Sequence, residues 1–127
     1  MNLIKTCLKF ADSITQVDIA KKSPFWKYEK YYGYYHLEDY QVNECKYWSS
    51  YDKGIWFSCN NWRIGDPKDE GTEKCDIKAP GSSDQLPTEL QGKWLFWNPD
   101  SQEWIKAGND ISVKFKRELP YNENAIE

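Results

Sequence analysis

The chain has one histidine and four cysteines that could supply nucleophilic or acid–base chemistry. His36 lies in the run YYHLED beside Glu38 and Asp39, and any triad or cysteine–histidine pair would have to use it as the base. Residues so close along one strand or turn do not form a triad, so we interpret His36 as an outward-facing side chain. Cys45 and Cys59 are the conceivable nucleophiles, but both lie in apolar sequence, which favours packing or disulfide formation.

Carboxylates are the second set of groups that could do chemistry. A pair of them could hydrolyse a glycosidic bond, and the candidates are Glu29, Glu38, Asp39 and Glu103. The sequence brings no two of these to a working separation. Residues 66–73, DPKDEGTE, offer oxygen ligands for Ca²⁺, but they do not match the EF-hand pattern. We therefore predict no catalytic site, no metal and no cofactor.

Aromatic residues make up 17% of the chain, which is a large share. Trp and Tyr combine an apolar face with a polar group and suit binding surfaces. Because side chains alternate along a strand, Trp56 faces away from the core if Ile55 and Phe57 face it. The same reasoning selects four candidates for an exposed ligand-binding surface: Tyr34, His36, Trp56 and Trp97. The alternative is a two-layer sandwich, which needs apolar residues on more than one face.

The four cysteines leave the redox setting open. Cys7, Cys45, Cys59 and Cys75 contain no C-x-x-C spacing, so neither a zinc knuckle nor a thioredoxin-type pair is expected. They could form disulfides or remain free thiols in the core. The N-terminal residues have no continuous apolar region of a secretory signal. The protein is therefore expected to be intracellular, or to have lost a leader.

Charge and hydropathy narrow the classes of partner. The formal net charge is −3, without a basic patch, so we expect no nucleic-acid binding by phosphate neutralisation. No apolar run approaches the roughly 18 residues of a membrane span. The remaining partners are a carbohydrate or a protein surface.

The elements that position these residues are predicted to be short strands, because aromatic and β-branched residues favour strands. We expect a short helix near residues 2–11 and a turn-rich region over 65–92. A hairpin turn is expected at 51–54, with Gly54 supplying a positive φ. The final three strands are expected to form an antiparallel meander. The predicted strands are 14–19, 26–37 with a bulge or close backbone approach at Gly33, 42–48, 55–59, 62–64, 74–78, 93–97, 103–106 and 111–115.

Several landmarks recur in a familiar order between residues 14 and 115. They are Gly33-Tyr34-Tyr35, Val42-Asn43, Trp62-Arg63-Ile64-Gly65, Trp94, Trp104 and Ile111-Ser112-Val113. This order resembles a small β module, without a settled family name, that is repeated or appended in secreted eukaryotic proteins. Two positions depart from its pattern: Glu44 stands where the module has glycine, and Phe115 where it often has cysteine. The resemblance implies a β domain and slightly favours an extracellular setting.

These observations predict an all-β protein with one compact domain over residues 1–119 and a flexible tail over 120–127. The domain is expected to be a mainly antiparallel sandwich or a partly open barrel. The leading functional hypothesis is a non-enzymatic recognition module that uses exposed aromatic residues. The alternatives are a small hydrolase with a carboxylate pair and a structural or host-interaction effector.

Overall fold

The computed structural model describes residues 13–20 and 24–116. The helix predicted for 2–11, Cys7 and the tail over 120–127 lie outside these residues. In the described part no helix is long and apolar enough to cross a membrane. The prediction of an all-β, antiparallel fold is confirmed.

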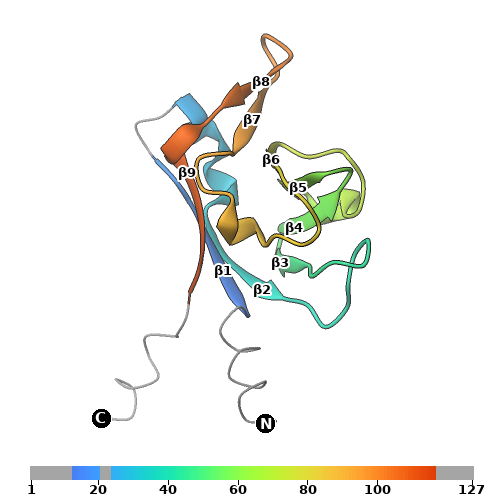
Figure 1. Cartoon of the computed structure of the whole chain (residues 1–127). Coiled ribbons are helices and arrows are strands. Elements are labelled where there is room, and N and C mark those ends of the chain that lie inside the picture. Colours follow the sequence, from blue (N-terminus) through green and yellow to red (C-terminus); the bar gives the residue numbers. More distant parts are fainter. Residues whose placement is uncertain (1–12, 21–23, 117–127) are drawn as a thin grey trace, which may run out of the picture.

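A single nine-stranded antiparallel sheet curls into a half-barrel (Figure 1), so the partly open barrel is the correct alternative and the sandwich is not. The spatial order of the strands is β8-β7-β6-β5-β4-β3-β2-β1-β9. The strands are β1 (Ile14–Ile19), β2 (Gly33–Leu37), β3 (Trp48–Ser50), β4 (Lys53–Ser58), β5 (Asn61–Gly65), β6 (Ile77–Pro80), β7 (Leu95–Asn98), β8 (Glu103–Lys106) and β9 (Ile111–Phe115). The connecting 3₁₀ turns are η1 (Pro24–Tyr31), η2 (Pro67–Asp69), η3 (Pro87–Glu89) and η4 (Gly108–Asp110).

The last strand closes onto the first, so the predicted three-strand meander at the end of the chain is wrong. β8 pairs with β7, but β9 pairs with β1. This pairing sets Val17 opposite Val113 and Ile19 opposite Ile111 on the concave face. Both pairs are buried, so the core favours this position for β9 over a place beside β8.

The concave face of the sheet holds the main core, which is built largely from rings. Alternation along β1 sends Val17 and Ile19 inward, while Gln16 points outward. The open side of the curl is filled by the segment around η3, which packs against β9 and buries Leu90 completely. The largest fully buried side chains of this core are Trp48, Trp62, Trp94, Tyr31 and Tyr35.

One predicted strand and the first part of another are absent from the described structure. Residues 26–28 belong to η1, which has a kink at Tyr28. In 42–48 the chain makes a tight turn, in which Val42 and Cys45 exchange two backbone hydrogen bonds, and β3 begins only at Trp48. Gly54 lies inside β4 rather than in the turn, which is formed by Tyr51 and Asp52.

Candidate functional site

Tyr34 and His36 lie on the outer, convex face of β2, as alternation predicts. Tyr34 is 49% exposed and His36 is also exposed. Tyr34 pairs with Gln16 on β1, whereas His36 pairs with Ile14 on β1 and with Ser49 on β3. This part of the surface is open to solvent.

Trp56 lies on the outer face of β4, but it is 0% exposed, so the expectation of an exposed ring there is wrong. The reason is the loop between β5 and β6, which folds over this face. The indole Nε1 donates a hydrogen bond of 2.8 Å to the Thr72 carbonyl. The ring packs with Val42 and Tyr47 in a small second core, against which Cys75 is packed. We call this group the outer cluster.

Two glycines make room for the outer cluster. Gly54 and Gly65 are direct partners in the β4–β5 ladder. A Cβ on Gly54 would lie 2.8 Å from the Tyr47 hydroxyl oxygen, and one on Gly65 would lie 3.0 Å from Cη2 of Trp56. The missing side chains therefore let both rings lie close to the sheet.

Arg63 is the partner of Trp56 in the β4–β5 ladder, and it holds the loop between β5 and β6 in place. It is only 4% exposed. Its guanidinium donates to the carbonyl oxygens of Ser58 at 3.0 Å and Glu73 at 2.8 Å. Backbone carbonyls thus accept from a buried charge, and the loop conformation is tied to the sheet.

Trp97 is partly exposed, and the structure brings it together with a residue that the sequence analysis did not select. Trp104 is its direct partner on β8, with ring centroids 5.4 Å apart and ring planes at 60°. The Lys78 ammonium nitrogen lies 4.3 Å from the centroid of the Trp104 ring. The outer face of this hairpin therefore presents two tryptophans beside a cation, an arrangement with cation–π attraction. We call Lys78, Trp97 and Trp104 the tryptophan patch.

The sequence indicates only that Trp97 and Trp104 lie on neighbouring strands. The strands expected at 93–97 and 103–106 follow each other in the predicted meander, but the direct pairing of the two tryptophans is a finding of the structure. The position of Lys78 could not be found in this way, because β6 joins β7 through a long connection. The four predicted site residues lie in three separate places: Tyr34 and His36 on β2, Trp56 in the outer cluster, and Trp97 in the tryptophan patch.

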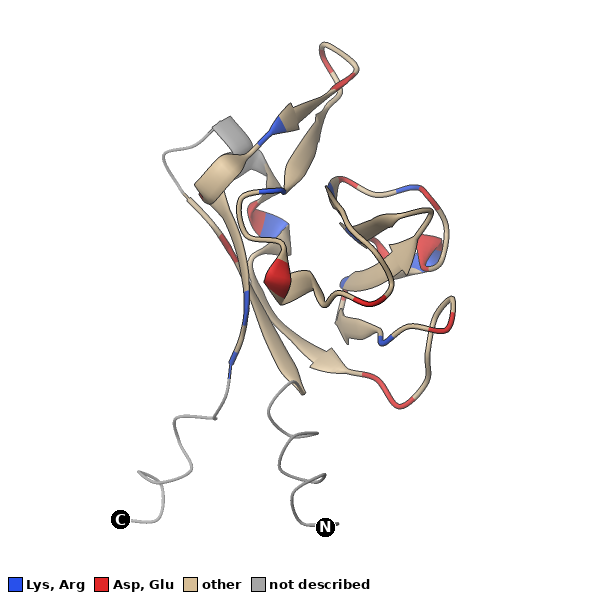
Figure 2. Ribbon diagram, viewed as in Figure 1, with Lys and Arg blue, Asp and Glu red and all other residues tan. Residues whose placement is uncertain are grey.

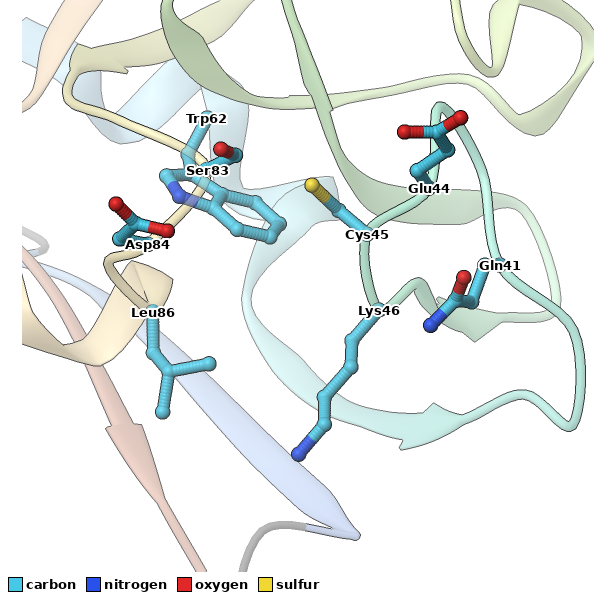
Figure 3. Close-up of a pocket in the computed structure, with 8 residues that line it drawn as sticks. All are labelled: Gln41, Glu44, Cys45, Lys46, Trp62, Ser83, Asp84 and Leu86. Carbon is cyan, nitrogen blue, oxygen red and sulfur yellow. The ribbon is translucent and has the colours of Figure 1, made fainter.

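A groove of about 300 Å³ lies between the segment 41–46 and the segment 83–86. Figure 3 shows Trp62, Ser83 and Asp84 on one side and Glu44 and Gln41 on the other, with Cys45 between them. Its remaining lining residues are Lys46 and Leu86. None of the four carboxylates selected from the sequence lines this groove.

The three described cysteines are free thiols. Cys59 is exposed in the β4–β5 turn, where it and Asn60 both have positive φ. Burial raises the pKa of the Cys45 thiol. Burial also raises the pKa of Cys75, although the neighbouring Arg63 opposes this shift. Raised thiol pKa values disfavour the thiolate, so these two side chains are poor nucleophiles near neutral pH.

No cluster of three or more His, Cys, Asp or Glu side chains that could hold a metal ion occurs within residues 13–20 and 24–116. Comparison with protein-family models, curated proteins and solved structures finds no match for the chain. The likeness to a small β module therefore stays a resemblance of motifs. The functional argument depends on the site geometry alone.

Proposed function

We propose that the protein is a non-enzymatic recognition module that binds a ligand through the tryptophan patch, the ligand being a protein surface or a carbohydrate. The observation that carries this proposal is the cross-strand pair of Trp97 and Trp104, both partly exposed on the outer face. Partly exposed tryptophans next to a basic residue are typical of binding hot spots.

The ring geometry favours a protein over a carbohydrate. A sugar stacks best on a flat and open aromatic face, but the two rings are inclined at 60°. One face of Trp104 also has the Lys78 ammonium over it. Inclined rings with a cation suit an uneven surface with apolar and acidic groups, as proteins present.

The alternative of a hydrolase with a carboxylate pair has less support. Glu38 accepts a hydrogen bond from the Ser49 hydroxyl, and Glu29, Asp39 and Glu103 are exposed. Glu103 lies at the start of β8 and Glu38 follows β2, which are far apart in the strand order. A structural or effector role is compatible with the same surface and differs only in the partner.

The proposal is tested with a variant in which Trp97 and Trp104 are both replaced by alanine. Glycan arrays and cross-linking screens on the full chain identify a ligand, and its Kd is then measured for each variant. Loss of hot-spot contacts costs about 2 kcal/mol or more, roughly a thirtyfold rise in Kd. The matched control is Tyr51→Ala, because Tyr51 is 99% exposed on the distant β3–β4 turn.

Two results would count against the proposal. One is a ligand whose Kd is unchanged in the double variant. The other is an equal loss of binding in the Tyr51→Ala control. Circular dichroism of each variant must match that of the wild type for the comparison to hold.

A further inference from the structure

The outer edge of β8 carries backbone groups without partners among the described residues. β8 stands at one end of the strand order, so only one of its sides pairs, with β7. The Ala107 amide donates to the Trp94 carbonyl at 2.9 Å, so these two residues form a hydrogen-bonded pair of the antiparallel ladder. Because hydrogen-bonded pairs alternate, Ile105 bonds toward β7, and the amide and carbonyl groups of Trp104 and Lys106 point outward.

The opposite edge of the sheet differs in its accessibility. β9 is also an end strand, and its outward-facing residues resemble those of β8, with Lys114 exposed and Ser112 partly so. The segment around η3 packs against β9. The edge of β8 is more open, because in the described part of the chain β7 is the one element that packs against β8 to a comparable extent. A further strand would therefore add to β8 rather than to β9.

On the outer face of the sheet, the charged side chains next to the β8 edge are basic. Register places Lys78, Leu95 and Lys106 in a row across β6, β7 and β8 on the outer face. Within these three strands the outer face carries no carboxylate, because Glu103 has the opposite orientation to Trp104. Figure 2 shows the basic residue at the end of β8 and acidic residues toward the tip of the hairpin.

We propose that the edge of β8 binds an extended acidic peptide segment of a partner protein, which adds to the sheet as a further antiparallel or parallel strand. Main-chain hydrogen bonds to Trp104 and Lys106 would supply affinity, and an acidic side chain beside Lys106 and Lys78 would supply specificity. The inference rests on the proposed function and names the partner class for the same surface. Two copies of this chain are a poorer fit, because their lysines would gather on one face.

The test uses two synthetic peptides of equal length, one alternating Glu and Val and the other alternating Lys and Val. Each is titrated into the isotope-labelled full chain and followed by NMR. The Glu–Val peptide is expected to bind at least about tenfold more tightly. On binding, hydrogen exchange of the Trp104 and Lys106 amides is expected to slow, which a contact through side chains alone would not cause.

Charge reversal at Lys106 provides the decisive variant. Lys106→Glu is expected to reverse the preference between the two peptides. The matched control is Lys74→Glu, which makes the same charge change at an exposed site in the loop before β6. This variant should still prefer the Glu–Val peptide. Equal affinity for both peptides would overturn the inference, as would slow exchange at these amides caused by self-association without peptide.

The outcome separates this inference from the proposed function. A ligand that depends on Trp97 and Trp104 but leaves the two β8 amides unprotected would overturn strand addition and leave the recognition module standing. If the acidic peptide protects the amides but no ligand depends on the two tryptophans, strand addition stands and recognition through the tryptophan patch is overturned.

Discussion

Trp56 has a structural role in the outer cluster, because its ring is packed there and its indole nitrogen is hydrogen-bonded. The ring is fully buried, and Nε1 donates to the Thr72 carbonyl. Trp97 lies on the same face of the sheet, but no loop covers it to the same extent. The two residues should therefore respond differently to truncation.

Replacing Trp56 by alanine should lower the free energy of unfolding by about 3–5 kcal/mol, because it removes a large buried side chain and leaves a cavity. Trp97→Ala should cost distinctly less. Chemical denaturation of both variants measures the difference. Equal losses in the two variants would contradict the assignment of Trp56 to a core.

Alternation along β4 predicted correctly that Trp56 faces away from the main core. It could not predict burial, because burial depends on the loop over residues 66–76, which returns across the outer face. This return is fixed by contacts distant in sequence, such as Arg63 with the Glu73 carbonyl. The face of the sheet on which a side chain lies is thus set by local alternation, whereas its exposure to solvent depends on tertiary contacts.

At the scale of elements, the pair of glycines in β4 and β5 decides how closely the outer cluster approaches the sheet. Gly54→Ala should lower the free energy of unfolding by about 1–3 kcal/mol, as overpacking does. The new Cβ would meet the Tyr47 hydroxyl oxygen at 2.8 Å. The cost should therefore be smaller when measured in a Tyr47→Phe background.

A double-mutant cycle on Gly54 and Tyr47 measures this coupling directly. Additive effects would show that the alanine is accommodated without touching Tyr47. The quantity to compare is the cost of Gly54→Ala in each background, which cancels the effect of Tyr47→Phe alone on stability.

Elements with clean alternation were predicted with accurate bounds. The predicted strands 14–19, 103–106 and 111–115 coincide with β1, β8 and β9. The failure at 26–28 has a physical cause in η1. Its tyrosines Tyr28 and Tyr31 are three residues apart, which places them on one side of a 3₁₀ turn, where they contact each other. Because the aromatic residues in this segment are so closely spaced, they match both the two-residue period of a strand and the three-residue period of a 3₁₀ turn.

At the scale of the whole molecule, buried tyrosines link stability to alkaline pH. Burial and the hydrogen bond to Asp76 raise the pKa of Tyr31 far above its ordinary value of 10.0. Burial also raises the pKa of Tyr35, whose hydroxyl donates to the Tyr31 carbonyl, and that of Tyr47. The folded state therefore keeps protons that the unfolded chain releases.

The free energy of unfolding should accordingly be unaffected by these groups below about pH 10 and should fall as the pH rises above it. Denaturation curves at a series of alkaline pH values measure the slope. In Tyr35→Phe, which removes one of these hydroxyls, the slope should be shallower. A slope that stays the same in this variant would contradict the link to Tyr35.

The pairing of β1 with β9 also decides how the fold responds to tension. Lys116 donates its backbone amide to the Ile14 carbonyl at 2.8 Å, so the first strand begins where the last one ends. A force that pulls these two points apart acts across the ladder, along the direction of its hydrogen bonds. The hydrogen bonds between β1 and β9 then break one after another. The end strand β9 therefore separates from β1 before the tryptophan patch is disturbed.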